Sequence, residues 1–198
     1  MRVRELYMSS LAAETVLTAE EYLASERKVG VKSEYIAGQV LAMSGASLAH
    51  VLITGDIATE LNVRLRGTTC EVVANDMRVR AGAADAYFYP DVAVFCGTPQ
   101  FEDNVFDTLL NPTVIIEVLS PSTESYDSGE KFAHYQRIAS LREYILVSQD
   151  RVRVAQSCLR GTHWVHTEFT TPEAVLPLNA IACELPLLDI YRRVPELL

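Results

Sequence analysis

The sequence predicts a single α/β domain in which a mixed β-sheet is flanked by helices. First, segments with helical and strand patterns alternate along the chain, which is typical of a sheet packed between helices. Second, several strand segments are short runs of Val, Ile and Leu, as in strands that are covered on both faces. Third, 198 residues with 49% hydrophobic and 22% charged side chains suffice for one globular core.

The domain boundaries follow from the same patterns. We assign residues 1–17 to an N-terminal extension and residues 18–198 to one domain, because no repeat, low-complexity tract or linker divides them. No apolar run approaches the roughly 20 residues that span a bilayer, and the N-terminus lacks the apolar core of a signal peptide. We therefore expect a cytoplasmic protein without a membrane partner.

The first third of the domain predicts a helix, a hairpin and a long helix. Thr18-Ala-Glu-Glu21 has the form of a capping box, which begins a short helix. Strand-forming residues at 35–43 surround Gly38, which indicates a hairpin. From Leu48 to Arg66 apolar residues recur at roughly helical spacing, and Gly67 ends the pattern.

The remaining elements are mainly strands. Asp127 or Ser128 is expected to cap a helix that reaches about Ile138. The predicted strands cover residues 70–74 and 77–81, the segments around Asp91 and Glu117, residues 143–148, and a terminal meander at 152–156 and 162–166. The tail, residues 185–198, is apolar enough to need a partner surface, either on its own domain or on a second subunit of a homodimer.

The spacing of the cysteines and the net charge of the chain argue against several functional classes. The four cysteines are widely separated and form no C-x-x-C pair, which excludes a zinc ribbon and a thioredoxin-type motif and predicts buried free thiols. A net charge of -9 argues against general, sequence-independent nucleic-acid binding. It leaves room for a local basic groove, and it suits a site that loads metal cations.

Glu117 is the most informative residue, because it lies within an apolar strand where an unpaired charge would cost several kcal/mol. Asp91 lies in a similar setting, and neighbouring strands could bring both carboxylates to one end of the sheet. A shared divalent cation would offset the cost, since Mg2+ prefers oxygen ligands and keeps several waters. The backbone carbonyl of Val118 is the expected third ligand.

Lys131 is the expected third catalytic group. The sequence places it in the first turn of its helix, where the helix dipole disfavours a cation. If this helix begins beside the Glu117 strand, the ammonium could reach the metal site. There it could polarise an attacking water or hold a scissile phosphate.

Several motifs together resemble the Uma2 family (DUF820) of restriction-endonuclease-like proteins. They are Pro90-Asp91, the run from Ile116 to Lys131, Tyr135, and Leu141-Arg-Glu-Tyr-Ile-Leu-Val147. The resemblance implies a restriction endonuclease-like core of the PD-(D/E)XK nuclease superfamily, whose members cut nucleic acid with Mg2+. It makes Asp91 the motif aspartate and Glu117 the second metal ligand. The superfamily lysine would stand at position 119, which is leucine here, so Lys131 takes that role.

Each candidate also has a purely structural interpretation. Glu117 could be ion-paired within a structural network, and Asp91 could bond its own backbone beside Pro90. Lys131 could be an exposed lysine paired with Asp127 four residues earlier, a pair worth ~0.2–0.5 kcal/mol.

Two further residues could support the site. Glu34 could join the metal site or form a surface pair with Lys32, and His50 could approach substrate or be a hydrogen-bonded structural histidine. Arg78 and Arg80 could face a phosphate backbone, although a solvated strand face is commoner.

The resulting hypothesis is an enzyme, a Mg2+-dependent endonuclease that hydrolyses phosphodiester bonds in nucleic acid, with DNA as the expected substrate and Mn2+ as a substitute metal. Asp91, Glu117 and the Val118 carbonyl would hold the metal, and Lys131 would position or help deprotonate the water. One alternative is a non-catalytic nucleic-acid or protein interaction module on the same fold. Another is a metal-dependent hydrolase of a small phosphate compound.

Overall fold

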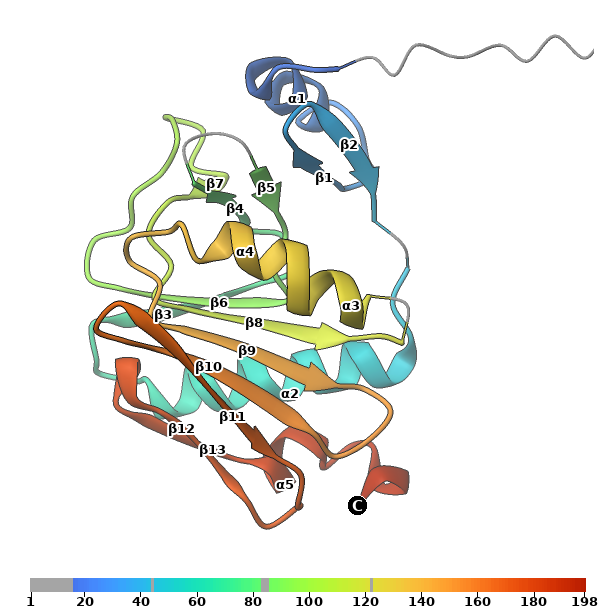
Figure 1. Cartoon of the computed structure of the whole chain (residues 1–198), viewed down its shortest axis with the longest axis vertical. Coiled ribbons are helices and arrows are strands. Elements are labelled where there is room, and N and C mark those ends of the chain that lie inside the picture. The colour runs from blue at the N-terminus through green and yellow to red at the C-terminus, as the bar shows by residue number, and fades with distance from the viewer. Residues whose placement is uncertain (1–15, 44, 83–85, 122) are drawn as a thin grey trace, which may run out of the picture.

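The computed structural model describes residues 16–43, 45–82, 86–121 and 123–198, so residues 1–15 of the N-terminal extension lie outside the described residues. Its centre is a six-stranded mixed sheet in the order β11-β10-β9-β8-β6-β3, with a five-stranded sheet in the order β2-β1-β5-β4-β7 beside it (Figure 1). The hairpin β12-β13 completes the fold. The predicted α/β class, a mixed sheet flanked by helices, is confirmed.

Short strands and five α-helices make up the described chain. The strands are β1 (Ser33–Ile36), β2 (Gln39–Ala42), β3 (Cys70–Ala74), β4 (Arg78–Ala81), β5 (Ala86–Phe88), β6 (Val92–Cys96), β7 (Thr108–Leu109), β8 (Val114–Leu119), β9 (Glu143–Ser148), β10 (Val154–Arg160), β11 (His163–Phe169), β12 (Val175–Leu178) and β13 (Cys183–Pro186). The α-helices are α1 (Ala19–Glu26), α2 (Leu48–Arg64), α3 (Glu124–Tyr126), α4 (Phe132–Tyr135) and α5 (Leu187–Tyr191). A π-helical turn covers Asp127–Lys131, and 3-10 turns cover Asn179–Ile181 and Pro195–Leu197. No helix within the described ranges is long and apolar enough to cross a membrane.

Strand β8 lies in the middle of the large sheet, antiparallel to β6 and parallel to β9, and all six of its residues are buried. Alternate side chains of β8 enter two different cores, as the two-residue period of a strand requires. Ile116 and Val118 pack in the core that contains α2, whereas Ile115 and Leu119 pack in the core that contains Phe132 of α4. Figure 1 shows α2 behind the sheet and α3 and α4 in front of it.

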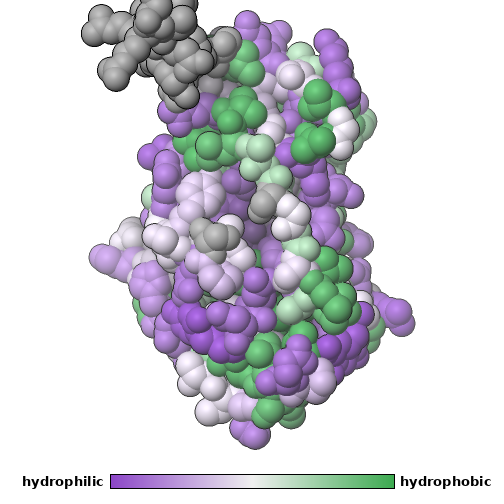
Figure 2. All heavy atoms as spheres, turned by 90° about the vertical axis from the view of Figure 1, so that its right-hand side faces the viewer, coloured by the Kyte–Doolittle hydropathy of each residue, from purple (hydrophilic) through white to green (hydrophobic). Residues whose placement is uncertain are grey.

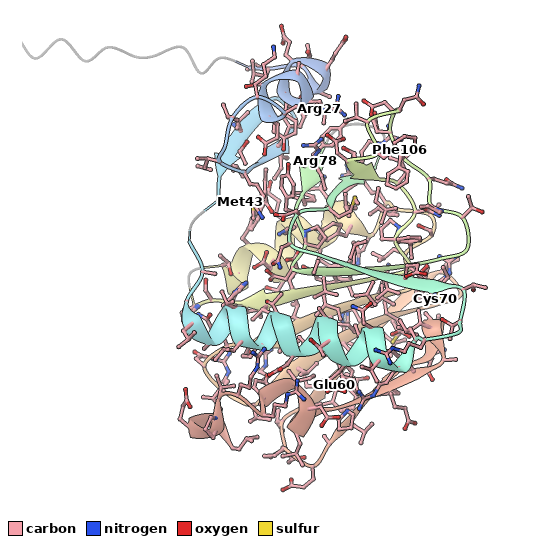
Figure 3. The ribbon with its side chains drawn as sticks, turned by 180° about the vertical axis from the view of Figure 1, so that it is seen from behind. Arg27, Met43, Glu60, Cys70, Arg78 and Phe106 are labelled. Atoms are coloured by element: carbon pink, nitrogen blue, oxygen red, sulfur yellow. A yellow bond between two sulfur atoms is a disulfide. The ribbon has the colours of Figure 1, made fainter. Side chains whose placement is uncertain are left out.

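The first predicted helices are confirmed. In α1 the Thr18 side chain accepts from the Glu21 N–H while the Glu21 carboxylate accepts from the Thr18 N–H, which is the expected capping box. The long helix α2 starts after Ser47, whose hydroxyl caps it by accepting from the His50 N–H. Figure 3 shows α2 lying across the sheet from behind, with Cys70 beyond its C-terminal end.

The helix expected to start at Asp127 or Ser128 begins earlier, at Glu124, and ends at Tyr135. Asp127 is therefore not an N-cap, and Lys131 does not lie in a first helical turn. A π-helical turn at Asp127–Lys131 interrupts this helix and changes the spacing of its side chains from the regular helical period. Such turns are frequent at functional sites, and both Asp127 and Lys131 are buried here.

The C-terminal tail packs on its own domain. Leu187, Ile190 and Tyr191 of α5 are buried in the same core as α2. Arg192 and Arg193 follow α5, and each forms an ion pair with the buried carboxylate of Asp56 on α2. The apolar tail therefore finds its partner surface within the chain.

One prediction about the cysteines is wrong, because Cys70 and Cys96 form a disulfide. The two residues lie directly opposite each other where β3 pairs with β6, a proximity that spacing along the sequence does not reveal. Cys158 and Cys183 are free. Disulfides persist mainly in oxidising compartments, so the bridge counts against the expected cytoplasmic location, which stays a prediction.

Candidate active site

Glu117 points from β8 toward the helices in front of the sheet, and its side chain is almost wholly buried. Its Oε1 lies 2.9 Å from Lys131 Nζ and accepts a hydrogen bond of 3.0 Å from the Tyr135 hydroxyl. Its Oε2 accepts from the backbone N–H of Asp91 at 3.4 Å. Three residues from two segments, the helix that ends at Tyr135 and the turn before β6, therefore fix this carboxylate, and the structural network weighed as an alternative is present around it.

Asp91 lies in the turn immediately before β6, at the end of the sheet where β8 finishes. Its Oδ2 accepts a 2.7 Å hydrogen bond from the Val118 N–H, and its Oδ1 lies 2.8 Å from His50 Nε2. These partners come from β8 and α2, so Asp91 ties two elements together rather than bonding its own backbone. Both Asp91 and His50 are partly exposed, with 17% and 19% of their side-chain surfaces accessible.

The backbone of Val118 also faces this end of the site. Within a strand, the N–H and C=O of one residue point to the same side. The Val118 N–H points to Asp91, whereas the next carbonyl, that of Leu119, accepts from Gln149 after β9 on the opposite side. The Val118 carbonyl is therefore directed to the Asp91 side of β8.

Lys131 is buried among carboxylates. Its Nζ lies 2.8 Å from Glu34, 2.9 Å from Glu117 and 3.5 Å from Asp127. Only 6% of its side chain is exposed, so the interpretation as a solvated helix lysine is wrong. The ammonium also lies 5.5 Å from the ring centroid of Phe88, an additional cation–π contact.

Glu34 reaches the site from β1 of the other sheet. It is buried, and its second carboxylate oxygen accepts a 3.1 Å hydrogen bond from the Tyr126 hydroxyl. The surface pair of Glu34 with Lys32, one of the two alternatives for this residue, does not form; Lys32 pairs with Asp76 at 2.9 Å instead. The site is therefore assembled from both sheets and from the helices between them.

Burial and the surplus of carboxylates over cations shift the pKa values of the ionisable groups in this cluster. Burial raises the pKa of Glu117 to about 8, with Asp127, Asp91 and Glu34 adding to the shift and Lys131 opposing it. Burial also raises the pKa of Asp127. For Lys131 burial works in the opposite direction, but its three carboxylate neighbours outweigh it and hold the pKa of the ammonium well above its usual range. Lys131 is thus protonated, and the Glu117 carboxyl retains its proton near neutral pH.

Two buried tyrosines contribute contacts that the sequence did not reveal. The Tyr135 hydroxyl donates to Glu117, and the Tyr144 hydroxyl donates to the backbone carbonyl of Asp127 at 2.9 Å. The four-residue spacing between Lys131 and Tyr135 is the signal that could have placed both side chains on one helix face.

Arg78 does not face solvent or a phosphate-binding surface. Only 3% of its side chain is exposed, and it donates to Thr108 and Tyr89 at 2.9 and 2.8 Å. Figure 3 shows it among the elements of the five-stranded sheet. Arg80 instead forms an ion pair with Glu102. The expectation of a solvated strand face is wrong for Arg78, because its charge is paired with Asp107 inside the fold.

The donor set at the sheet end consists of oxygen atoms. Within the described ranges no three Asp, Glu, His or Cys side chains form a complete metal cage. Asp91, Glu117 and the Val118 carbonyl nonetheless lie together at this end of the sheet, where a backbone N–H of the neighbouring segment holds each of the two carboxylates. Such a sparse oxygen set fits Mg2+, which is usually held by one or two carboxylates and several waters.

Comparison with known proteins places the chain in a family. The model of the Uma2 family, described as "putative restriction endonuclease", matches residues 19–188. The chain belongs to the Uma2 family. A Uma2 relative from Synechocystis sp., the uncharacterized protein sll1609, is 36% identical over 173 residues, which cover 87% of this chain and 98% of that protein. A second Synechocystis protein, the uncharacterized slr1290, is 38% identical over 138 residues, 70% of this chain and 72% of its own.

A solved structure shares the Uma2 fold. The crystal structure of a protein from Anabaena variabilis, described as "a putative nuclease belonging to DUF820", superposes with a TM-score of 0.73. The match covers 89% of this chain and 98% of that protein, at 21% sequence identity. At this identity the likeness establishes the fold, and it agrees with the restriction endonuclease-like core that the sequence motifs implied.

Proposed function

We propose that this Uma2 protein is a metal-dependent endonuclease that hydrolyses phosphodiester bonds in nucleic acid, with DNA as its preferred substrate. The convergence of Asp91, Glu117 and Lys131 at one end of the six-stranded sheet carries the proposal. The family description and the nuclease description of the Anabaena protein support the same reaction class.

The metal would be Mg2+, with Mn2+ as a substitute, held by Asp91, Glu117 and the Val118 carbonyl. A divalent cation bound there would supply a more acidic water and would stabilise negative charge on the phosphate. The carboxylates fit this role because the surrounding backbone already orients them: the Val118 N–H holds Asp91, and the Asp91 N–H holds Glu117.

Other side chains of the protein hold the two carboxylates in position. Lys131 lies 2.9 Å from Glu117 and is protonated in the metal-free protein, so it fixes the position of this carboxyl group. The Tyr135 hydroxyl holds the same carboxylate oxygen. His50 is the more exposed neighbour, and its contact with Asp91 orients the second carboxylate at the mouth of the site. Lys131, Tyr135 and His50 are accordingly positioning residues.

A non-catalytic module on the same fold is the second candidate. It is favoured by the way Lys131 is enclosed, because a buried ammonium with three carboxylate partners can serve stability alone. The net charge of -9 favours a protein ligand over nucleic acid for such a module. The two functions differ in one respect: only the endonuclease cleaves a bond, and it needs the carboxylates to do so.

The deciding experiment mixes the protein with supercoiled plasmid and short duplexes in Mg2+, Mn2+ or EDTA. We expect metal-dependent cleavage that Glu117→Gln abolishes. Glu143→Gln is a matched control, since Glu143 is another buried carboxylate, on the neighbouring strand β9 but beside the start of β8. Cleavage that survives unchanged in Glu117→Gln would come from a contaminant and would refute the proposal. Binding of a partner without any cleavage would support the non-catalytic module.

A further inference from the structure

Strand β2 forms one edge of the five-stranded sheet. All four of its residues are exposed, and within the described residues it pairs on one side only, with β1. The other side presents unpaired backbone N–H and C=O groups, which are a template for another strand. Natural proteins usually protect such edges with charged residues, proline or a covering segment.

The sequence of this edge provides no charge for protection. From Tyr35 to Ala49 the chain contains no charged residue, and the side chains of Val40 and Leu41 are 45% and 39% exposed. Both edges of the six-stranded sheet, β3 and β11, carry a glutamate within the strand, Glu71 and Glu168. Strand β2 therefore lacks a feature that normally prevents association.

Exposed hydrophobic side chains are concentrated in the segment of the chain that contains β2. Of the fourteen large hydrophobic residues that are strongly exposed in the described chain, seven lie between residues 16 and 51. They are Val16, Val29, Val31, Val40, Leu41, Leu48 and Val51. Figure 2 shows hydrophobic groups over the upper part of the face that β2 and the start of α2 share. Clustered apolar surface of this kind marks an interaction site.

We infer that β2 pairs antiparallel with β2 of a second copy of this chain, about a two-fold axis. An antiparallel pair of identical strands is its own complement, so the interface closes at two chains. Like charges opposite each other would destabilise such a pair, and this strand has none. Because each copy carries a net charge of -9, an uncharged edge is the surface on which two copies approach with the least repulsion.

The hairpin geometry places Val40 in the interface. A two-residue turn, Ala37-Gly38, joins β1 to β2, and both residues have positive φ angles, 47° and 99°. The residues that flank such a turn, Ile36 and Gln39, form a hydrogen-bonded pair, so the backbone groups of the next residue, Val40, point outward. Substitutions at Val40 therefore act on the free edge without removing a β1 contact of the backbone.

The test uses opposite charges at this position. Val40→Lys and Val40→Glu should each raise the dimer dissociation constant by about tenfold or more, because two like charges are then brought close together along the paired edges. An equimolar mixture of the two variants should regain the two-chain species. Val165→Lys, on the exposed edge strand β11, is the matched control and should remain dimeric. Sedimentation velocity over a wide concentration range measures the mass, and thermal unfolding verifies that each variant is folded.

Two outcomes would overturn the inference. One is a wild-type protein that stays monomeric at every concentration; if its β2 amides are then protected from hydrogen exchange, another segment of the same chain covers the edge. The other is a wild-type dimer that neither charge at position 40 weakens, which would put the interface elsewhere. Nuclease activity is not a readout here, so the result is independent of the proposed function.

Discussion

Replacing Lys131 by methionine tests the central feature of the site, a single ammonium shared by three buried carboxylates. Methionine keeps most of the side-chain length and removes the charge. In the wild type Nζ lies within 3.5 Å of Glu34, Glu117 and Asp127, all of which are buried. Removing one partner of a buried ion pair costs about 3–5 kcal/mol, because the remaining charge stays buried without compensation.

The size of this loss should depend on pH. Burial already raises the pKa of Glu117 to about 8, so at pH 6 this carboxyl is protonated and the variant buries less uncompensated charge. At pH 9 it is ionised, and the full cost appears. We therefore expect the loss of unfolding free energy in Lys131→Met to be larger at pH 9 than at pH 6.

Urea unfolding followed by circular dichroism measures the loss of unfolding free energy at pH 6 and at pH 9. Glu34→Gln, made in the wild type and in Lys131→Met, completes a double-mutant cycle. It should destabilise the wild type, where it breaks an ion pair of 2.8 Å, and restore part of the stability of the methionine variant. A Lys131→Met protein within about 0.5 kcal/mol of the wild type at both pH values would refute the reasoning.

Three other perturbations test separate features. The metal-free protein should lose unfolding free energy as the pH rises from about 5 to 8, because the raised pKa of Glu117 stabilises the fold only while this carboxyl is protonated; the decline should be absent in Glu117→Gln. Mn2+ or Mg2+ should raise the thermal midpoint of the wild type more than that of Asp91→Asn, and equal shifts would argue against the metal site. Cys70→Ser should cost about 3.5 kcal/mol in urea unfolding, since the bridge closes a loop of 26 residues, whereas Cys158→Ser should cost far less.

Local patterns predicted the elements that depend on local interactions. The capping box at Thr18, the hairpin around Gly38 and the helix after Ser47 depend on neighbouring residues, and the structure contains all three. Glu117 stood out because an apolar strand is a costly place for a charge, and the structure shows its buried partners. Its role in catalysis stays a prediction.

The features that local patterns did not predict depend mainly on contacts between segments that are distant in the sequence. Glu34 and Lys131 are 97 positions apart in sequence (131 - 34 = 97), and only the packing of the two sheets brings them to 2.8 Å. The buried pairing of Arg78 with Asp107 and the Cys70–Cys96 bridge have the same origin. The π-helical turn is local, but it breaks the regular period on which helix prediction depends.

The Cys70–Cys96 bridge makes residues 70–96 a covalent ring that includes Asp91. A protease that cleaves the chain once inside this ring would leave a single molecule, in which both fragments remain joined through sulfur. The fragment that begins after the cut would keep Asp91 on the same polypeptide as Glu117 and Lys131, provided that the cut precedes residue 91. Such a nicked protein would run as one band without reductant and as two bands with it, and it could retain the whole site.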